Sequence, residues 1–274
     1  MDYPGKEAVL LKLQSENQTI TESNELFELA AMMVLGDRTE QQDCIGWSLE
    51  TNGGMVVLCD GMGGHQGGSR ASAAAVDCFL NAYTQISGVQ PSPLLAKATM
   101  EANKTVCNLK DPDGLPLKAR RTLAAVILRD GELFWSSVGD SRVYLARGDA
   151  FVQITQDQNY RTVLDEQLRS GAITAEEYNR NLPRAEALIS YLGIGDLRLV
   201  DHNSVPLGLC QGDKLILMSD GLYKLLPDEV IFRILENFSS PRDALHALEM
   251  KVRSKAKNSA VLRDNMTVAL IKLK

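Results

Sequence analysis

The stretch from Met55 to Gly68 constrains the fold most, because an apolar run ends there in a carboxylate and a loop rich in glycine. The run Met-Val-Val-Leu-Cys, residues 55–59, is typical of a strand buried on both faces. Asp60 follows it, and the glycines after Asp60 let a bare backbone approach a ligand closely. Ser69 then begins an amphipathic helix. Such a strand and loop suit a hard cation such as Mg²⁺ or Mn²⁺, although a strand–turn–helix corner with a capping aspartate has the same pattern.

Four further aspartates lie beside runs that are predicted to be strands, namely Asp43, Asp140, Asp220 and Asp264. Asp220 follows the apolar run 214–218, and Asp264 precedes the run 266–271. Aspartate is common in turns, so each one taken alone could have only a local role. Several of them at the ends of apolar strands in one chain suggest a shared acidic cluster.

Six short motifs occur in a fixed order and together span about residues 30–272. They are Arg38-x-x-x-Gln-Asp43, Asp60-Gly-Met-Gly-Gly-His65, Thr122-Leu-Ala-Ala, Gly139-Asp-Ser-Arg-Val-Tyr144, Ser219-Asp-Gly-Leu222 and Asp264-Asn-Met-Thr267. Each motif is weak by itself, but six in order make coincidence a poor explanation. The chain therefore resembles the PPM family of metal-dependent protein serine/threonine phosphatases, protein phosphatase type 2C, in its bacterial form.

The resemblance implies a pair of Mn²⁺ or Mg²⁺ ions held mainly by carboxylates. In this scheme Asp60 bridges both ions, the Gly61 carbonyl binds one of them, and Asp220 and Asp264 bind the other. Asp140, together with Asp220, is implied to bind a third, weaker ion, and a turn or cap role is the alternative for each aspartate. Two such ions lower the pKa of a bridging water and neutralise the negative charge on the phosphoryl oxygens, so that hydroxide can attack phosphorus directly.

The resemblance also assigns catalytic roles to Arg38 and Asp43. Arg38 matches a phosphate-binding arginine, because a guanidinium suits two phosphate oxygens at once, and a surface arginine is the alternative. Asp43 is implied to lie beside the metals and to bind an ion directly or through a metal-bound water. The general acid is not assigned, because His65 could either donate the proton or shape its loop, and a metal-bound water could also deliver the proton.

No repeat or linker interrupts the chain, so residues 26–274 are predicted to form one domain, preceded by an N-terminal arm or leader strand at residues 1–25. Predicted strands and helices are grouped rather than alternating, which favours an α+β fold with antiparallel sheets. The resemblance implies a four-layer α-β-β-α sandwich, in which helix pairs flank two stacked sheets and the metal cleft lies at one end. It also implies a flap at about residues 157–190, where the pattern indicates helix. Locally, we predict a strand at 197–200 and a helix capped by Ser92.

Composition limits the partners of the chain. The formal charge of -6 and the pI near 5.2 argue against a nucleic-acid-binding protein. The five cysteines are scattered and include no C-x-x-C pair, which indicates reduced thiols in a cytoplasmic protein. The longest apolar run, residues 29–35, is too short to span a bilayer, and no signal peptide is visible. We expect a monomer without nucleic-acid or membrane partners.

The predicted function is Mn²⁺- or Mg²⁺-dependent hydrolysis of phosphoserine and phosphothreonine on proteins, without a phosphoenzyme. Phosphorylated proteins are the implied substrates, and a cognate serine/threonine kinase is the implied partner system. Two alternatives stay open, a two-metal hydrolase of small phosphoesters and a non-catalytic relative that binds phosphoproteins.

Overall fold

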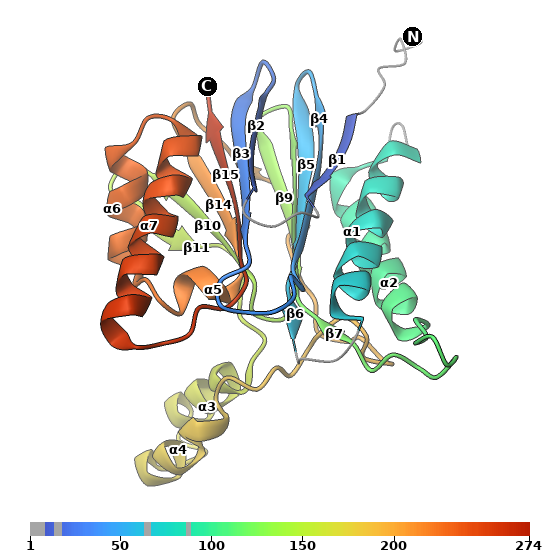
Figure 1. Cartoon of the computed structure of the whole chain (residues 1–274), viewed down its shortest axis with the longest axis vertical. Helices are drawn as coiled ribbons and strands as arrows, with labels where there is room; N and C mark the ends of the chain where they lie inside the picture. The colour runs from blue at the N-terminus through green and yellow to red at the C-terminus, as the bar shows by residue number, and fades with distance from the viewer. Residues whose placement is uncertain (1–8, 14–17, 63–66, 86–88) are drawn as a thin grey trace.

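Two β-sheets stack face to face, and a pair of helices covers the outer face of each sheet (Figure 1). The computed structural model describes residues 9–13, 18–62, 67–85 and 89–274. Every described strand pair in the two sheets is antiparallel. The α+β sandwich of four layers that the sequence predicted is therefore confirmed.

The first sheet has the strand order β1-β4-β5-β8-β9-β12, and β13 also pairs with β9. Its members are β1 (Val9–Leu13), β4 (Cys44–Glu50), β5 (Gly53–Cys59), β8 (Leu123–Arg129), β9 (Glu132–Val138), β12 (Asp201–His202) and β13 (Leu207–Gly208). The central strand β5 is buried along its whole length, as its unbroken apolar run predicts. Met55 and Val57 face the helices, whereas Val56 and Leu58 face the other sheet.

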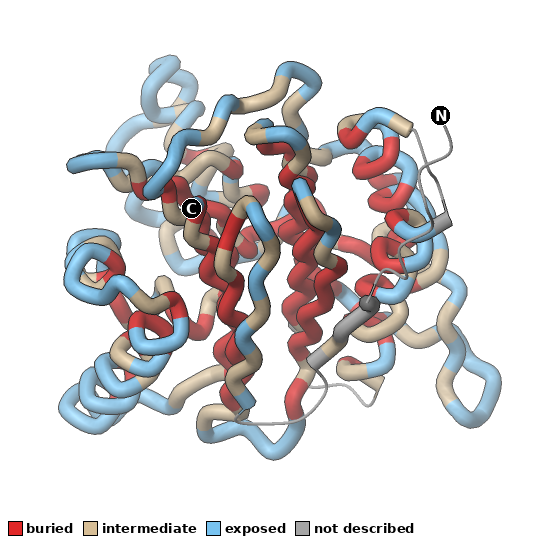
Figure 2. The backbone as a smooth tube through the Cα atoms, turned by 90° about the horizontal axis from the view of Figure 1, so that it is seen from above, coloured by how far each residue is buried: buried red, intermediate tan, exposed pale blue. Residues whose placement is uncertain are grey.

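The second sheet has the order β11-β10-β14-β15-β3-β2. Its members are β2 (Gln18–Ser23), β3 (Phe27–Val34), β10 (Arg142–Arg147), β11 (Ala150–Gln153), β14 (Lys214–Met218) and β15 (Met266–Leu273). The segment predicted as an arm or leader strand thus contains two strands, β1 and β2, and each adds an edge strand to one sheet. Seen from above, buried residues concentrate in the strands of the two central layers (Figure 2).

The helix pairs bury one face each against the sheets. They are α1 (Gly68–Gln85) and α2 (Pro91–Cys107) on the first sheet, and α6 (Asp228–Asn237) and α7 (Pro241–Ser259) on the second. Ser240 caps α7 and accepts a hydrogen bond from the backbone N–H of Asp243. The predicted cap at Ser92 is wrong, because α2 already begins at Pro91, where the missing proline N–H costs no helical hydrogen bond.

The flap (residues 157–190) projects from the end of the sandwich that carries α5 (Figure 1). It contains α3 (Tyr160–Arg169), α4 (Ala175–Asn181) and a 3-10 turn at Leu182–Arg184. The prediction of helix throughout is wrong in detail. Gly171 interrupts the helix with a φ of +74°. Thr174 then caps a new helix with a capping box.

Two further local findings complete the fold. The strand predicted at 197–200 is absent, because β9 ends at Val138 and pairs with this segment only at Asp201 and His202. Among the described residues, no helix is both long and apolar enough to cross a membrane.

Three short elements lie at the flap end of the sheets. Strand β6 (Gly61–Met62) pairs with β7 (Arg120–Arg121), and the short helix α5 (Asp220–Tyr223) lies at the same end.

Candidate metal centre

A polar cleft of about 300 Å³ opens at the end of the sandwich where these short elements meet. Asp60 ends β5, Asp220 begins α5, and Asp264 lies two residues before β15. Five of the residues predicted for the site line the cleft, namely Arg38, Asp60, Gly61, Asp220 and Asp264. The fold thus brings together three acidic turns that are far apart in the sequence.

Glycines allow these turns to pack backbone against backbone. A Cβ atom on Gly221 would lie 2.0 Å from the carbonyl oxygen of Asn265, so only glycine lets α5 approach the start of β15 so closely. A Cβ atom on Gly61 would lie 2.6 Å from the carbonyl oxygen of Gln42. Gly61 therefore leaves room for the loop before β4 beside the Asp60 turn.

Asp43 lies buried behind the cleft rather than in its lining. Its Oδ2 accepts hydrogen bonds from the Ser219 hydroxyl at 3.1 Å and the Thr267 hydroxyl at 2.7 Å. Burial, together with the negative charge of Asp220, raises the pKa of Asp43 to about 6, even though the Thr267 and Ser219 hydroxyls favour the ionised form. Asp43, the residue before β4, is thus bound to the residue after β14 and to β15.

The carboxylates of the site repel one another. Burial raises the pKa of Asp60 well above its ordinary value, and the charges of Asp43, Asp220 and Asp140 raise it further. Such a cluster is costly when all its members are ionised, and a bound cation removes that cost. The donor set consists of oxygen atoms only, which fits Mg²⁺ or Mn²⁺.

Asp140 supplies the clearest sign that these oxygens can accept a cation. The side chain is 2% exposed, and its Oδ2 is buried without a hydrogen-bond partner among the residues that the structure describes. Burial, followed by the charge of Asp220, raises the pKa of Asp140 to about 6. A buried carboxylate oxygen without a partner is costly unless it binds a proton or a cation.

Two basic side chains now hold two of the cleft carboxylates. Arg38 contacts Asp264 at 2.5 Å, and Lys224 contacts Asp220 at 2.6 Å. Within the described ranges, no three His, Cys, Asp or Glu side chains form a group that could hold one ion together. A metal bound at Asp220 and Asp264 would compete with these two ion pairs for the carboxylate oxygens.

Several residues that shape the site lay in the motifs without an assigned role. Asn265 accepts a hydrogen bond from the Gln42 N–H at 2.9 Å and donates one to the Leu35 carbonyl at 2.8 Å, so it holds the loop that carries Arg38. Asn265 and Ser219 lie next to an aspartate and Thr267 ends the same motif as Asp264, which was their only sequence signal. Lys224 lies outside the motifs, four residues after Asp220. His65 lies outside the described residues.

Comparison with known proteins assigns the chain to a class. A sequence model described as protein phosphatase 2C matches residues 35–253. The serine/threonine phosphatase Stp of Listeria innocua is 30% identical over 235 residues, which cover 81% of this chain and 89% of that protein. Fold and cleft, with these matches, define a phosphatase of the metal-dependent PPM type. The chain belongs to the protein phosphatase 2C family.

Solved structures agree on the fold. The serine/threonine phosphatase of Streptococcus agalactiae superposes with a TM-score of 0.76 at 23% identity, covering 90% of this chain and 100% of that one. The catalytic domain of PstP, solved in complex with two manganese ions, has a TM-score of 0.70 at 24% identity and covers 90% of this chain and 98% of its own. The family, fold and enzyme class predicted from the sequence are therefore confirmed.

Proposed function

We propose that this protein hydrolyses phosphoserine and phosphothreonine on other proteins, using Mn²⁺ or Mg²⁺ bound in the cleft between the sheet ends. The observation that carries the proposal is the cluster of Asp60, Asp220 and Asp264 around one cleft, with the unpartnered Oδ2 of Asp140 buried nearby. The family match and the Listeria phosphatase support the same activity.

The carboxylates would hold the ions. Asp60 would bridge two of them, the Gly61 carbonyl would bind one, and Asp220 and Asp264 would bind the other. When bound, the ions lower the pKa of a water and offset the negative charge of the phosphoryl group. The two manganese ions in the PstP structure support a pair in this chain as well. Asp140 would bind a third, weaker ion together with Asp220.

Asp43 and Arg38 have different tasks in this proposal. The hydroxyls of Ser219 and Thr267 fix the orientation of the Asp43 carboxylate, which suits a group that accepts a proton or orients a water beside Asp60. The Arg38 side chain is 56% exposed at the mouth of the cleft. Once its ion pair with Asp264 opens, its guanidinium can donate two hydrogen bonds to a phosphate.

The wider setting stays a prediction. Phosphorylated proteins are the substrates that the family relatives imply, and a cognate serine/threonine kinase would supply them. The scattered cysteines predict a cytoplasmic enzyme, and a monomer is the expected state.

One experiment tests the activity against its two rivals. Wild type, Asp220→Ala and the matched surface variant Asp149→Ala are assayed on p-nitrophenyl phosphate and on a phosphothreonine peptide, with Mn²⁺ or with EDTA. We expect Mn²⁺-dependent activity on both substrates for wild type and Asp149→Ala, and its loss in EDTA and in Asp220→Ala. Activity on the small ester alone would indicate a hydrolase of small phosphoesters. No activity on either substrate would indicate a non-catalytic phosphoprotein-binding relative.

A further inference from the structure

Strand β10 carries an arginine at each end, and each arginine forms an ion pair with an aspartate. At the cleft end, Arg142 binds Asp157, with Nη2 and Oδ2 2.7 Å apart and Nε and Oδ1 3.0 Å apart. At the opposite end, Arg147 binds Asp213, with the matching distances 2.6 Å and 2.9 Å. The two pairs have the same chemistry and differ in what surrounds them.

The surroundings of Arg142 connect the flap with the helix that begins at the proposed metal ligand Asp220. Its guanidinium lies over the ring of Tyr223, 3.7 Å from the ring centroid. Tyr223 is the last residue of α5, the helix that Asp220 begins. A guanidinium is attracted to the negative face of an aromatic ring, and shielding from water strengthens this attraction. Arg142 thus holds the far end of the helix that presents Asp220.

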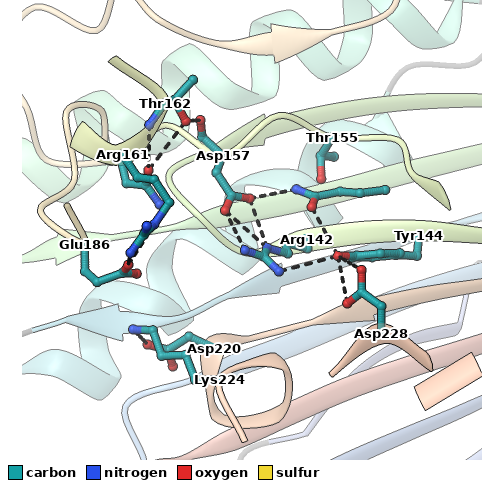
Figure 3. A network of polar contacts seen from close by, with 12 residues as sticks. Arg142, Tyr144, Thr155, Asp157, Arg161, Thr162, Glu186, Asp220, Lys224 and Asp228 are labelled. Atoms are coloured by element: carbon teal, nitrogen blue, oxygen red, sulfur yellow. Dashed lines mark hydrogen bonds and ion pairs between the residues drawn. The ribbon is translucent and has the colours of Figure 1, made fainter. Parts of the chain in front are cut away.

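The other partner of Arg142 stands at the base of the flap. Figure 3 shows Asp157 between Arg142 and the flap residue Thr162. The Thr162 hydroxyl donates a hydrogen bond to the Asp157 carbonyl at 2.9 Å, so the first turn of α3 is fastened to the residue that Arg142 binds. Gln153 on β11 also donates to the Asp157 carboxylate at 2.7 Å.

The same side chains border the buried part of the acidic cluster. The Tyr223 hydroxyl is buried without a hydrogen-bond partner among the described residues, as is Oδ2 of Asp140. The Asp140 charge lies close enough to act on the Tyr223 phenol, whose pKa is raised first by burial and then by that carboxylate. A change in the position of Tyr223 therefore alters the surroundings of both Asp140 and Asp220.

We propose that Arg142 is a positioning residue that couples the flap to the metal-binding end of α5, through Asp157 on one side and Tyr223 on the other. The guanidinium plane of Arg142 points its edge at the Asp157 carboxylate and its face at the Tyr223 ring. Both contacts can form at once only when the base of the flap and α5 keep their present spacing. Movement of the flap base then shifts α5, and binding of metal at Asp220 in turn restrains the flap. This inference rests on the proposed function, because it needs a metal at Asp220.

The test compares Arg142→Lys with the matched control Arg147→Lys. Lysine keeps the charge but loses the bidentate, planar contact. Mn²⁺ affinity is measured by calorimetry, and hydrogen exchange of residues 160–184 is measured with and without Mn²⁺. In wild type and Arg147→Lys we expect Mn²⁺ to slow exchange in the flap. In Arg142→Lys we expect Mn²⁺ to bind at least about fivefold more weakly and to leave flap exchange unchanged, because coupling between sites is reciprocal.

A second variant keeps the test decisive if Arg142→Lys does not fold. Thr162→Val removes the hydrogen bond to the Asp157 carbonyl in a partly exposed turn, and it should weaken Mn²⁺ binding in the same direction. The coupling would be overturned if the Arg142→Lys and Arg147→Lys proteins had equal Mn²⁺ affinity and equal protection of the flap from hydrogen exchange. The same two results for Thr162→Val and wild type would also overturn it. Failure of wild type to bind Mn²⁺ at all would instead overturn the proposed function.

Discussion

Raising the pH from 4 to 7.5 should destabilise the metal-free protein, and Asp140 should account for a measurable part of the loss. The folded protein raises the pKa of this carboxyl from 3.8 to about 6, mainly by burial. An acid whose pKa is higher in the folded state favours folding only while it is protonated. Below about pH 4 Asp140 therefore has almost no cost, and the cost is complete above about pH 6.

The magnitude follows from the size of the shift. A difference of about two pKa units corresponds to about 3 kcal/mol of unfolding free energy, which is reached when Asp140 is ionised at pH 7.5. At pH 4 the same calculation leaves a cost of about 0.5 kcal/mol. Because Asp140 is 2% exposed, water screens little of this cost. The Asp140→Asn protein lacks the titration, so its stability should fall less over this range, by roughly 2 kcal/mol.

The assay is urea unfolding in EDTA at pH 4, 5, 6 and 7.5 for wild type and Asp140→Asn. We expect the two proteins to differ little at pH 4 and the variant to be the more stable by about 2–3 kcal/mol at pH 7.5. Stability curves that run parallel across the whole range would refute the argument that burial of an unpartnered carboxylate costs stability here. Addition of Mn²⁺ at pH 7.5 should stabilise wild type, because an ion that binds only the folded state shifts unfolding by mass action.

Three substitutions test other parts of the site. Gly221→Ala should destabilise the protein by about 1–3 kcal/mol or more and abolish activity, because the added Cβ would lie 2.0 Å from the Asn265 carbonyl oxygen; unchanged thermal unfolding would contradict the packing argument. Arg38→Ala should raise KM for a phosphothreonine peptide by about 10- to 100-fold with little effect on thermal stability, and an unchanged KM would exclude a phosphate contact. Lys224→Gln should lower the Mn²⁺ concentration for half-maximal activity by about two- to fivefold, because it removes the cation that competes with Mn²⁺ for Asp220. A higher Mn²⁺ requirement would show instead that Lys224 supports metal binding.

The acidic turns could be predicted because their signal is local. A run of apolar residues followed by aspartate and glycine marks a buried strand and its turn, and β5 with Asp60 has that form in the structure. Their number at strand ends suggested a shared acidic cluster, and the order of the six motifs then implied which aspartates meet in one cleft. Periodicity alone does not say which strand ends are neighbours, because this depends on the order of strands within the sheets.

The contacts that orient the site could not be predicted for the same reason. The hydroxyls that bind Asp43 come from Ser219 and Thr267, which lie 176 and 224 residues away in the sequence. The register between the strands decides which hydroxyl faces Asp43, and no local pattern encodes it. The prediction of a strand at 197–200 failed for a similar reason. A strand needs a hydrogen-bonded neighbour, and β9, which ends at Val138, pairs only with Asp201 and His202 of this segment.

The most direct test of the central claim is the position of bound metal in crystals grown with Mn²⁺. The account predicts two anomalous scattering peaks in the cleft, with Asp60 between them and with Asp220 and Asp264 bound to one of them. In that structure Arg38 and Lys224 should have left the carboxylates that they contact in the metal-free protein. An enzyme that requires Mn²⁺ but shows its peaks away from these three aspartates would contradict the account.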